Sequence, residues 1–167
     1  MKRLNIALVA HDARKQELLE WCAYNAEKLS KHILYGTGTT ARMLGNIMVP
    51  VSRDNGCVGP DCMALPLTVH PLLSGPLGGD SQIGAMIAEG KIDVLIFFCD
   101  NLITQGHQQD VGALSRLASL YNIPFATNRT PADMIITSPL LEDDTYERLI
   151  PAALDKYKNR MNNLHAN

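Results

Sequence analysis

Several features that would mark a specialised class of protein are scarce in this sequence. Its 167 residues carry 15 Lys and Arg against 17 Asp and Glu, which gives a net charge of −2. No basic run stands out, so the sequence predicts no surface for a phosphate backbone and no nucleic-acid partner. The longest uninterrupted apolar run, residues 94–99, is far too short to cross a bilayer. We therefore expect no membrane partner either.

Cysteines are few and scattered. The four are Cys22, Cys57, Cys62 and Cys99, and a chain of this length buries enough apolar surface to fold without disulfides. This usage indicates a reducing compartment, so we expect the protein in the cytoplasm. Cys57 and Cys62 have a spacing that could bind a metal with His70 or close a local disulfide, but a single pair is a weak signal. With no compact ligand motif elsewhere, we expect no metal.

Short apolar runs alternate with segments of helical period. The runs predicted as strands are residues 5–10, 32–36, 67–70, 92–99 and 123–127. The predicted helices cover residues 13–30, 41–47, 111–121 and 151–164, with a further one starting at 130. This alternation predicts an α/β fold, a three-layer, Rossmann-like parallel sheet flanked by helices. We expect a single domain over residues 1–167 with an inserted loop or hairpin at about 49–68, where proline and glycine break the rhythm.

Three positions carry signals of a helix start. Thr130 and Asp133 have the spacing of a capping box, and Pro131 would then occupy the first helical position. Asp80 follows two glycines and precedes a helical run, so it is either a cap or a functional carboxylate, and the two roles are compatible. Asp110 could cap the helix expected at 111–121.

Polar residues gather where the predicted strands end. These residues are His11, Asp12 and Lys15 after the first strand, residues 37–40 after the second, residues 74–80 after the third, and Asp100, His107 and Asp110 after the fourth. Loops at the carboxyl ends of parallel strands share one edge of the sheet, which is where ligands bind in such folds. The sequence therefore predicts a single site at this edge.

Part of this edge is suited to an anion. A strand that enters a helix through Thr37, Gly38, Thr39 and Thr40 presents hydroxyls and unpaired backbone N–H groups, which bind phosphate well. Ser74 and Gly75 offer a second set of donors, and Lys15 offers a positive charge. The alternative is that Thr39 or Thr40 only caps the helix.

The carboxylates and histidines add acid–base chemistry. An ionised Asp80 next to a substrate carbon could act as a general base. His11 and His107 could donate to an oxyanion or form an acid–base pair, although solvated loop histidines are the simpler alternative. Asp12, Asp100 and Asp110 are each explained by turns or caps, but their convergence with Asp80 favours a catalytic site.

In sequence order the motifs resemble those of the methylglyoxal synthase family over nearly the whole chain. The matching segments are residues 11–15, 37–40, 73–82, 90–98 and 122–124. The resemblance implies a lyase that converts dihydroxyacetone phosphate into methylglyoxal and inorganic phosphate, without a metal or organic cofactor. It also implies a homohexamer that phosphate inhibits.

The resemblance assigns a role to each matching position. It makes Asp80 the catalytic base and Asp12, Asp100 and Asp110 further active-site carboxylates. The substrate and phosphate contacts that it implies are His11, Lys15, Thr37, Gly38, Thr39, Thr40, Ser74, Gly75 and His107. The family often has Trp-Asp-Pro where this chain has Cys99, Asp100 and Asn101, and the segment at 49–68 is extra relative to shorter members.

Two other functions remain open at this point. The same fold resembles the regulatory domain of carbamoyl-phosphate synthetase, which binds its ligand without moving a proton. A different phospho-sugar enzyme, an isomerase or an aldolase-like lyase, would use the same residue types. The clustered carboxylates favour an enzyme, because a pure anion-binding module gains nothing from them.

Overall fold

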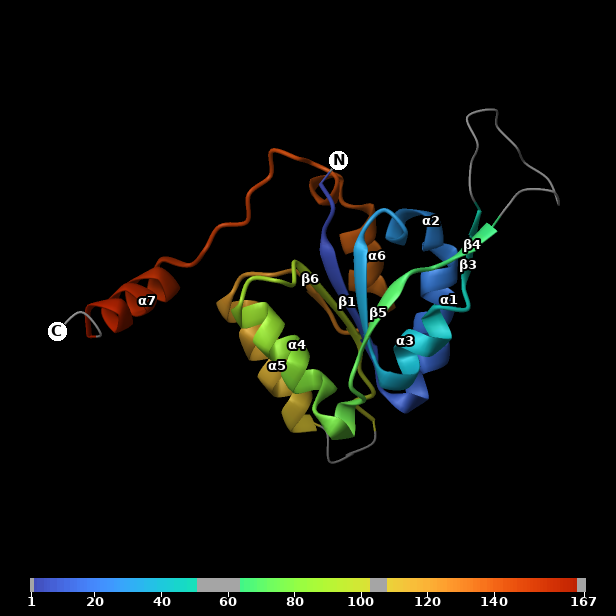
Figure 1. Cartoon of the computed structure of the whole chain (residues 1–167), viewed down its shortest axis with the longest axis horizontal. Helices are drawn as coiled ribbons and strands as arrows, with labels where there is room; N and C mark the ends of the chain where they lie inside the picture. Colours follow the sequence, from blue (N-terminus) through green and yellow to red (C-terminus); the bar gives the residue numbers. More distant parts are fainter. Residues whose placement is uncertain (1, 51–63, 103–107, 165–167) are drawn as a thin grey trace.

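The computed structural model describes residues 2–50, 64–102 and 108–164, and a five-stranded parallel sheet forms its centre (Figure 1). The strands are β1 (Asn5–Ala10), β2 (Ile33–Thr37), β5 (Val69–Leu72), β6 (Val94–Phe98) and β7 (Phe125–Ala126). Their spatial order is β5-β2-β1-β6-β7, and every neighbouring pair is parallel. Numbered by these strands alone, this is the Rossmann-type order 3-2-1-4-5. The predicted α/β architecture is confirmed.

Helices cover both faces of the sheet (Figure 1). One face carries α1 (Lys15–Tyr24), α2 (Ala26–Leu29), α3 (Gly38–Leu44) and α6 (Arg129–Thr137). The other face carries α4 (Gly79–Ala88) and α5 (Gln108–Leu120). The last helix, α7 (Ala152–Leu164), projects away from the sheet at the end of an extended segment. Among the described helices, none has the length and apolar character needed to span a membrane.

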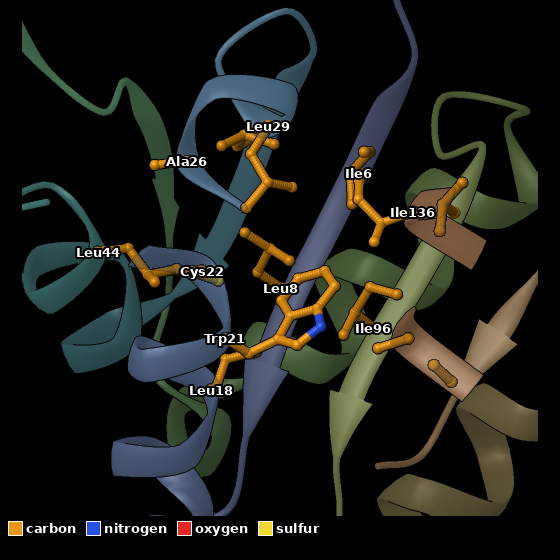
Figure 2. Close-up of a cluster of buried hydrophobic side chains, with 14 of the residues drawn as sticks. Ile6, Leu8, Leu18, Trp21, Cys22, Ala26, Leu29, Leu44, Ile96 and Ile136 are labelled. Carbon is orange, nitrogen blue, oxygen red and sulfur yellow. The ribbon is translucent and has the colours of Figure 1, made fainter. Parts of the chain in front are cut away.

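Alternation along the central strands divides the interior into two cores. In β1, Ile6 and Leu8 face the core under α1, whereas Ala7 and Val9 face the core under α4 and α5. All residues of β6 are buried, so a continuous apolar run forms where both faces of a parallel strand are covered. Figure 2 shows the first core, in which side chains of α1 meet those of β1 and β6.

Trp21 anchors α1 to this core. Its ring is fully buried and lies 6.1 Å from the Phe98 ring. Its indole N–H donates to Asp133 Oδ1 at 2.7 Å.

The α6 helix begins at Arg129 and not at the predicted capping box, so that prediction is wrong. The Asp133 carboxylate serves Trp21 instead of the helix end, and Pro131 fits because N–H groups of the first turn need no helical partner.

The long helix predicted at 13–30 is interrupted. A 3-10 turn (Asp12–Arg14) precedes α1, and Asn25 separates α1 from α2. The Asn25 side chain is buried and its Nδ2 donates to the Trp21 carbonyl at 2.9 Å. Such a local side-chain bond competes with the helical pattern and ends the helix there.

The segment predicted as an insertion begins and ends in a hairpin. Strands β3 (Met48–Pro50) and β4 (Ala64–Pro66) pair in antiparallel fashion. The Leu67 N–H donates to the Ile47 carbonyl at 2.7 Å, which extends this hairpin. The third sheet strand therefore spans Val69–Leu72, two residues later than predicted, because Leu67 is held by the hairpin.

Replacing Trp21 with Phe is expected to lower the free energy of unfolding by about 2–4 kcal/mol, because the change leaves a cavity in the core and removes the hydrogen bond to Asp133. Urea unfolding followed by circular dichroism measures the effect. Tyr24→Phe on the same helix is the matched control, since Tyr24 is 83% exposed and its change should be close to neutral. Similar midpoints for both variants would contradict the anchoring role.

Candidate functional site

The carboxyl ends of β1, β2 and β5 border a cavity of about 310 Å³. Its lining contains most of the predicted site residues, namely His11, Asp12, Lys15, Thr37, Thr39, Thr40, Ser74, Gly75 and Asp80. Pro76, within the predicted segment 74–80, also lines it, and so do Val9, Ala10 and Phe97, which sequence reasoning missed. In the sequence, Phe97 was interpreted only as an apolar strand residue. Its position next to the end of the predicted strand was the one signal that could have placed it at the site.

Two turns that carry donors meet backbone to backbone beside this cavity. A Cβ on Gly38 would lie 2.8 Å from Ser74 Cα, and Gly38 has a φ of +36°. A Cβ on Gly79 would overlap the carbonyl oxygen of Leu73. Gly38 does not itself line the cavity, so its place in the site is to let the two turns approach.

His11 is fixed in one tautomer. Its Nδ1 accepts a hydrogen bond from the Asp100 backbone N–H at 2.8 Å, so in the neutral ring the proton resides on Nε2. Nε2 is buried and has no hydrogen-bond partner, and the ring stands edge-on to Phe97 at 5.0 Å. A buried N–H without an acceptor is costly, and His11 also lines the cavity.

Asp100 acts through its main chain. Its Oδ1 accepts the Leu102 N–H at 3.1 Å, and Asp100 is not among the residues that line the cavity. The predicted convergence of carboxylates therefore brings Asp12 and Asp80 into the cavity, with Asp100 beside it. The backbone N–H of Asp100 orients the His11 ring, as hydrogen bonds from outside a binding site do in many proteins.

The cavity is also lined by a cation and by hydroxyl groups. Lys15 Nζ lies 2.6 Å from Asp12 Oδ1, and the Lys15 side chain is 23% exposed. Thr37 and Thr40 are buried, and Thr40 Oγ1 has no hydrogen-bond partner. A positive charge together with unpaired donors is the composition of an anion site.

Asp80 is the second residue of α4, and the residue before the helix is Gly78 in a left-handed conformation with a φ of 96°. The alternative that Asp80 caps this helix is therefore wrong. Its carboxylate forms no hydrogen bond or ion pair with the other residues that the structure describes. Asp80 therefore presents to the cavity a carboxylate that none of the other described residues pairs with.

Known proteins are similar to this chain in sequence. A profile of the MGS-like domain family matches residues 17–127. A methylglyoxal synthase of Vibrio parahaemolyticus is 49% identical over 140 residues, covering 84% of this chain and 82% of that protein. A methylglyoxal synthase of Proteus mirabilis is 52% identical over 141 residues, with the same coverage of each chain. The chain belongs to the methylglyoxal synthase family.

A solved structure supports the same grouping. The crystal structure of methylglyoxal synthase from Elizabethkingia anophelis is similar with a TM-score of 0.72 and 41% sequence identity. The similarity covers 89% of this chain and 86% of that one. The family profile begins at residue 17, so His11, Asp12 and Lys15 precede it, whereas the turns at residues 37–40 and 74–75 lie inside it.

The predicted site residue His107 lies outside the described residues, and so do Cys57 and Cys62, whose spacing was a weak signal for a metal or a disulfide. Asp110 is the third residue of α5, which begins at Gln108, so its predicted role as a helix cap is wrong, and its side chain is not described. Within the three described ranges, no three His, Cys, Asp or Glu side chains are grouped so that they could hold a metal ion.

Replacing Gly79 with Ala should damage the site through its backbone. Because the new Cβ would overlap the Leu73 carbonyl, the turn that carries Ser74 must shift, and we expect a loss of about 1–3 kcal/mol in the free energy of unfolding. Urea unfolding measures it. Gly112→Ala is the control, since a Cβ there meets nothing within 4 Å and alanine favours a helix. A Gly79→Ala protein as stable as the control would refute the close approach.

Proposed function

We propose that this protein converts dihydroxyacetone phosphate into methylglyoxal and inorganic phosphate. The observation that carries the proposal is that one cavity is lined by Asp80, whose carboxylate pairs with none of the other described residues, and by His11 and Thr40, whose Nε2 and Oγ1 have no hydrogen-bond partner. The relatives named methylglyoxal synthase, at 49% and 52% identity, support the same reaction. A phosphate ester needs the donors, and removal of a proton from carbon needs the base.

In the first proposed step, Asp80 takes a proton from the hydroxymethyl carbon of the substrate. The C–H electron pair becomes the C=C bond of an enediolate, and negative charge moves to the former carbonyl oxygen. His11 Nε2–H, together with His107, is the proposed donor to the substrate's oxygens. A positioned base contributes about 10²–10⁴ in rate, and one donor to a developing oxyanion contributes roughly 3 kcal/mol.

In the second proposed step, phosphate leaves. The hydroxyl on the deprotonated carbon becomes an aldehyde carbonyl as its proton passes to the departing phosphate oxygen. The C=C electron pair shifts toward the third carbon, and the C–O bond to phosphate breaks. Protonation of the resulting CH₂ group gives the methyl group of methylglyoxal. The breaking bond must stand out of the enediolate plane, so Lys15, residues 37–40, Ser74 and Gly75 are proposed to hold the phosphate in that orientation.

The remaining carboxylates have supporting roles in this proposal. Asp12 pairs with Lys15 at 2.6 Å and thereby positions the cation beside the phosphate. Asp100 presents its N–H to His11. Asp110 stays a proposed active-site carboxylate on its position at the start of α5. In a purely regulatory domain, Asp12 and Asp80 would lower the affinity of the cavity for an anion, because like charges repel.

Assembly, inhibition and location complete the proposal. We propose a homohexamer, supported by α7, which projects from the sheet (Figure 1), and by Leu149 and Tyr157, which are 80% and 66% exposed. Inorganic phosphate is proposed to inhibit by occupying the cavity that holds the substrate's phosphate. A cytoplasmic location is proposed because Cys22 and Cys99 are free thiols.

Asp80→Asn should retain the fold and lose at least the factor of about 10² that a general base supplies. Turnover is measured as methylglyoxal formed, and NMR of the products shows whether free phosphate accompanies it or glyceraldehyde phosphate appears instead. Ser81→Ala is the control, because Ser81 is exposed on the same turn of α4 and should keep normal turnover. Nearly normal activity of Asp80→Asn would remove Asp80 from its role.

Two substitutions of His11 test the proposed Nε2 donor. In His11→Gln the amide N–H can reach the position of Nε2, whereas in His11→Asn the shorter side chain can still accept from Asp100 but supplies no donor there. We expect kcat/KM to fall about tenfold or more further in His11→Asn than in His11→Gln. Steady-state kinetics gives the comparison. Equal values for the two variants would contradict the assignment of the donor to Nε2.

A further inference from the structure

One side chain of α4 bonds to the turn that precedes this helix. Gln82 is the fourth residue of α4, and its Oε1 accepts a hydrogen bond from the Leu73 backbone N–H at 2.8 Å. A backbone N–H needs an acceptor, so the oxygen of the Gln82 amide faces Leu73 and not the nitrogen. Gln82 does not line the catalytic cavity. Any effect that Gln82 has on a ligand in this cavity therefore passes through the turn.

The turn that Gln82 binds carries part of the proposed phosphate site. Leu73 directly follows the last residue of β5, and the next two residues, Ser74 and Gly75, both line the cavity. These two residues are donors that we propose for the phosphate of the substrate. The position of Leu73 thus decides where two of the phosphate donors lie.

The turn is attached to α4 by backbone bonds and by this one side chain. The Ser74 carbonyl accepts the N–H groups of Leu77 and Gly79 at 2.9 and 3.0 Å. On the other side of Ser74, the Leu73 N–H donates to Gln82. Leu73 comes after β5, which lies at the edge of the sheet with β2 as its neighbour in the described part of the chain. Gln82 is therefore where a side chain of α4 controls the position of the turn.

The same helix carries the proposed base. Asp80 is two residues before Gln82 in α4, and the Gln82 N–H donates to the Gly78 carbonyl at 3.0 Å, so this part of the helix is hydrogen-bonded. A regular helix fixes Asp80 relative to Gln82, and Gln82 in turn fixes Leu73. The proposed reaction needs the base at one end of a small substrate and the phosphate donors at the other. A displacement of about 1 Å between such groups costs rate.

We propose that Gln82 is a positioning residue of the proposed active site. Through its bond to the Leu73 N–H, it holds the turn of residues 73–75, and with it the phosphate of the substrate, in place relative to Asp80. Gln82 touches no reacting atom. Its effect on turnover rests on the proposed function, whereas its effect on the binding of phosphate stands without that function.

The test replaces Gln82 with Met, which keeps the length of the side chain and removes the acceptor oxygen. We expect the Kd for inorganic phosphate and the KM for dihydroxyacetone phosphate each to rise about threefold to tenfold, the effect of one hydrogen bond. Isothermal titration calorimetry and steady-state kinetics measure the two constants. A merely structural role would lower the folded fraction, and hence kcat and the number of phosphate sites, while KM and Kd stayed unchanged.

Gln16→Met is the matched control. It is the same substitution on α1, where Gln16 Nε2 donates to Glu20 Oε1 at 3.0 Å on the exposed surface, and it should leave both constants unchanged. Gln82→Asn is a second variant, which keeps an amide but is one CH₂ group too short to reach Leu73. It should raise the Kd for phosphate as much as Gln82→Met does. Thermal melting confirms that each variant is folded.

The outcomes separate this inference from the proposed function. The positioning role is overturned if both Gln82 variants keep the Kd and KM of the unaltered protein, or if Gln16→Met raises them equally. If the unaltered protein binds phosphate in a way that depends on Gln82 but forms no methylglyoxal, the proposed function fails and the positioning role is upheld.

Discussion

The register between β1 and β6 is the constraint on which the site depends. The two strands pair from Ile6 and Val94 to Ala10 and Phe98, and the ladder continues as the His11 N–H donates to the Phe98 carbonyl at 3.1 Å. This places the His11 ring where the Asp100 N–H can reach it. A slip of one residue would exchange the two cores, so the burial of both strand faces also fixes the position of the histidine.

The cavity combines groups that attract an anion with a carboxylate that repels it, so their separation matters for substrate binding. Lys15 and the donors of the two turns attract an anion, whereas Asp80 repels it. The close approach at Gly38 and Gly79 sets the spacing of the turns, and Asp80 sits one residue into α4, at its positive end. A rigid arrangement of this kind lets one end of a substrate bind as an anion while the other end meets a base.

Two histidines, His11 and His32, each accept a backbone N–H at Nδ1, from Asp100 and Leu4 respectively. In the described part of the chain, Nε2 is buried without a hydrogen-bond partner in His11 but not in His32. Asp80 shares the cavity of His11, so the catalytic chemistry is proposed for that cavity.

The sequence by itself determined the alternation of strands and helices, the α/β class and the edge of the sheet at which the site lies, because apolar periodicity and strand-end loops are local properties. The sequence did not predict that Asp133 binds Trp21 or that the first helix ends at Asn25. It also did not predict that the Asp100 carboxylate binds the N–H of its own loop. Each of these features depends on one hydrogen bond. The short sequence around each side chain is equally compatible with a bond to a different partner, so the sequence does not predict which bond forms. The tautomer of His11 is set by a partner 89 residues away, and only the assembled sheet brings those two atoms together.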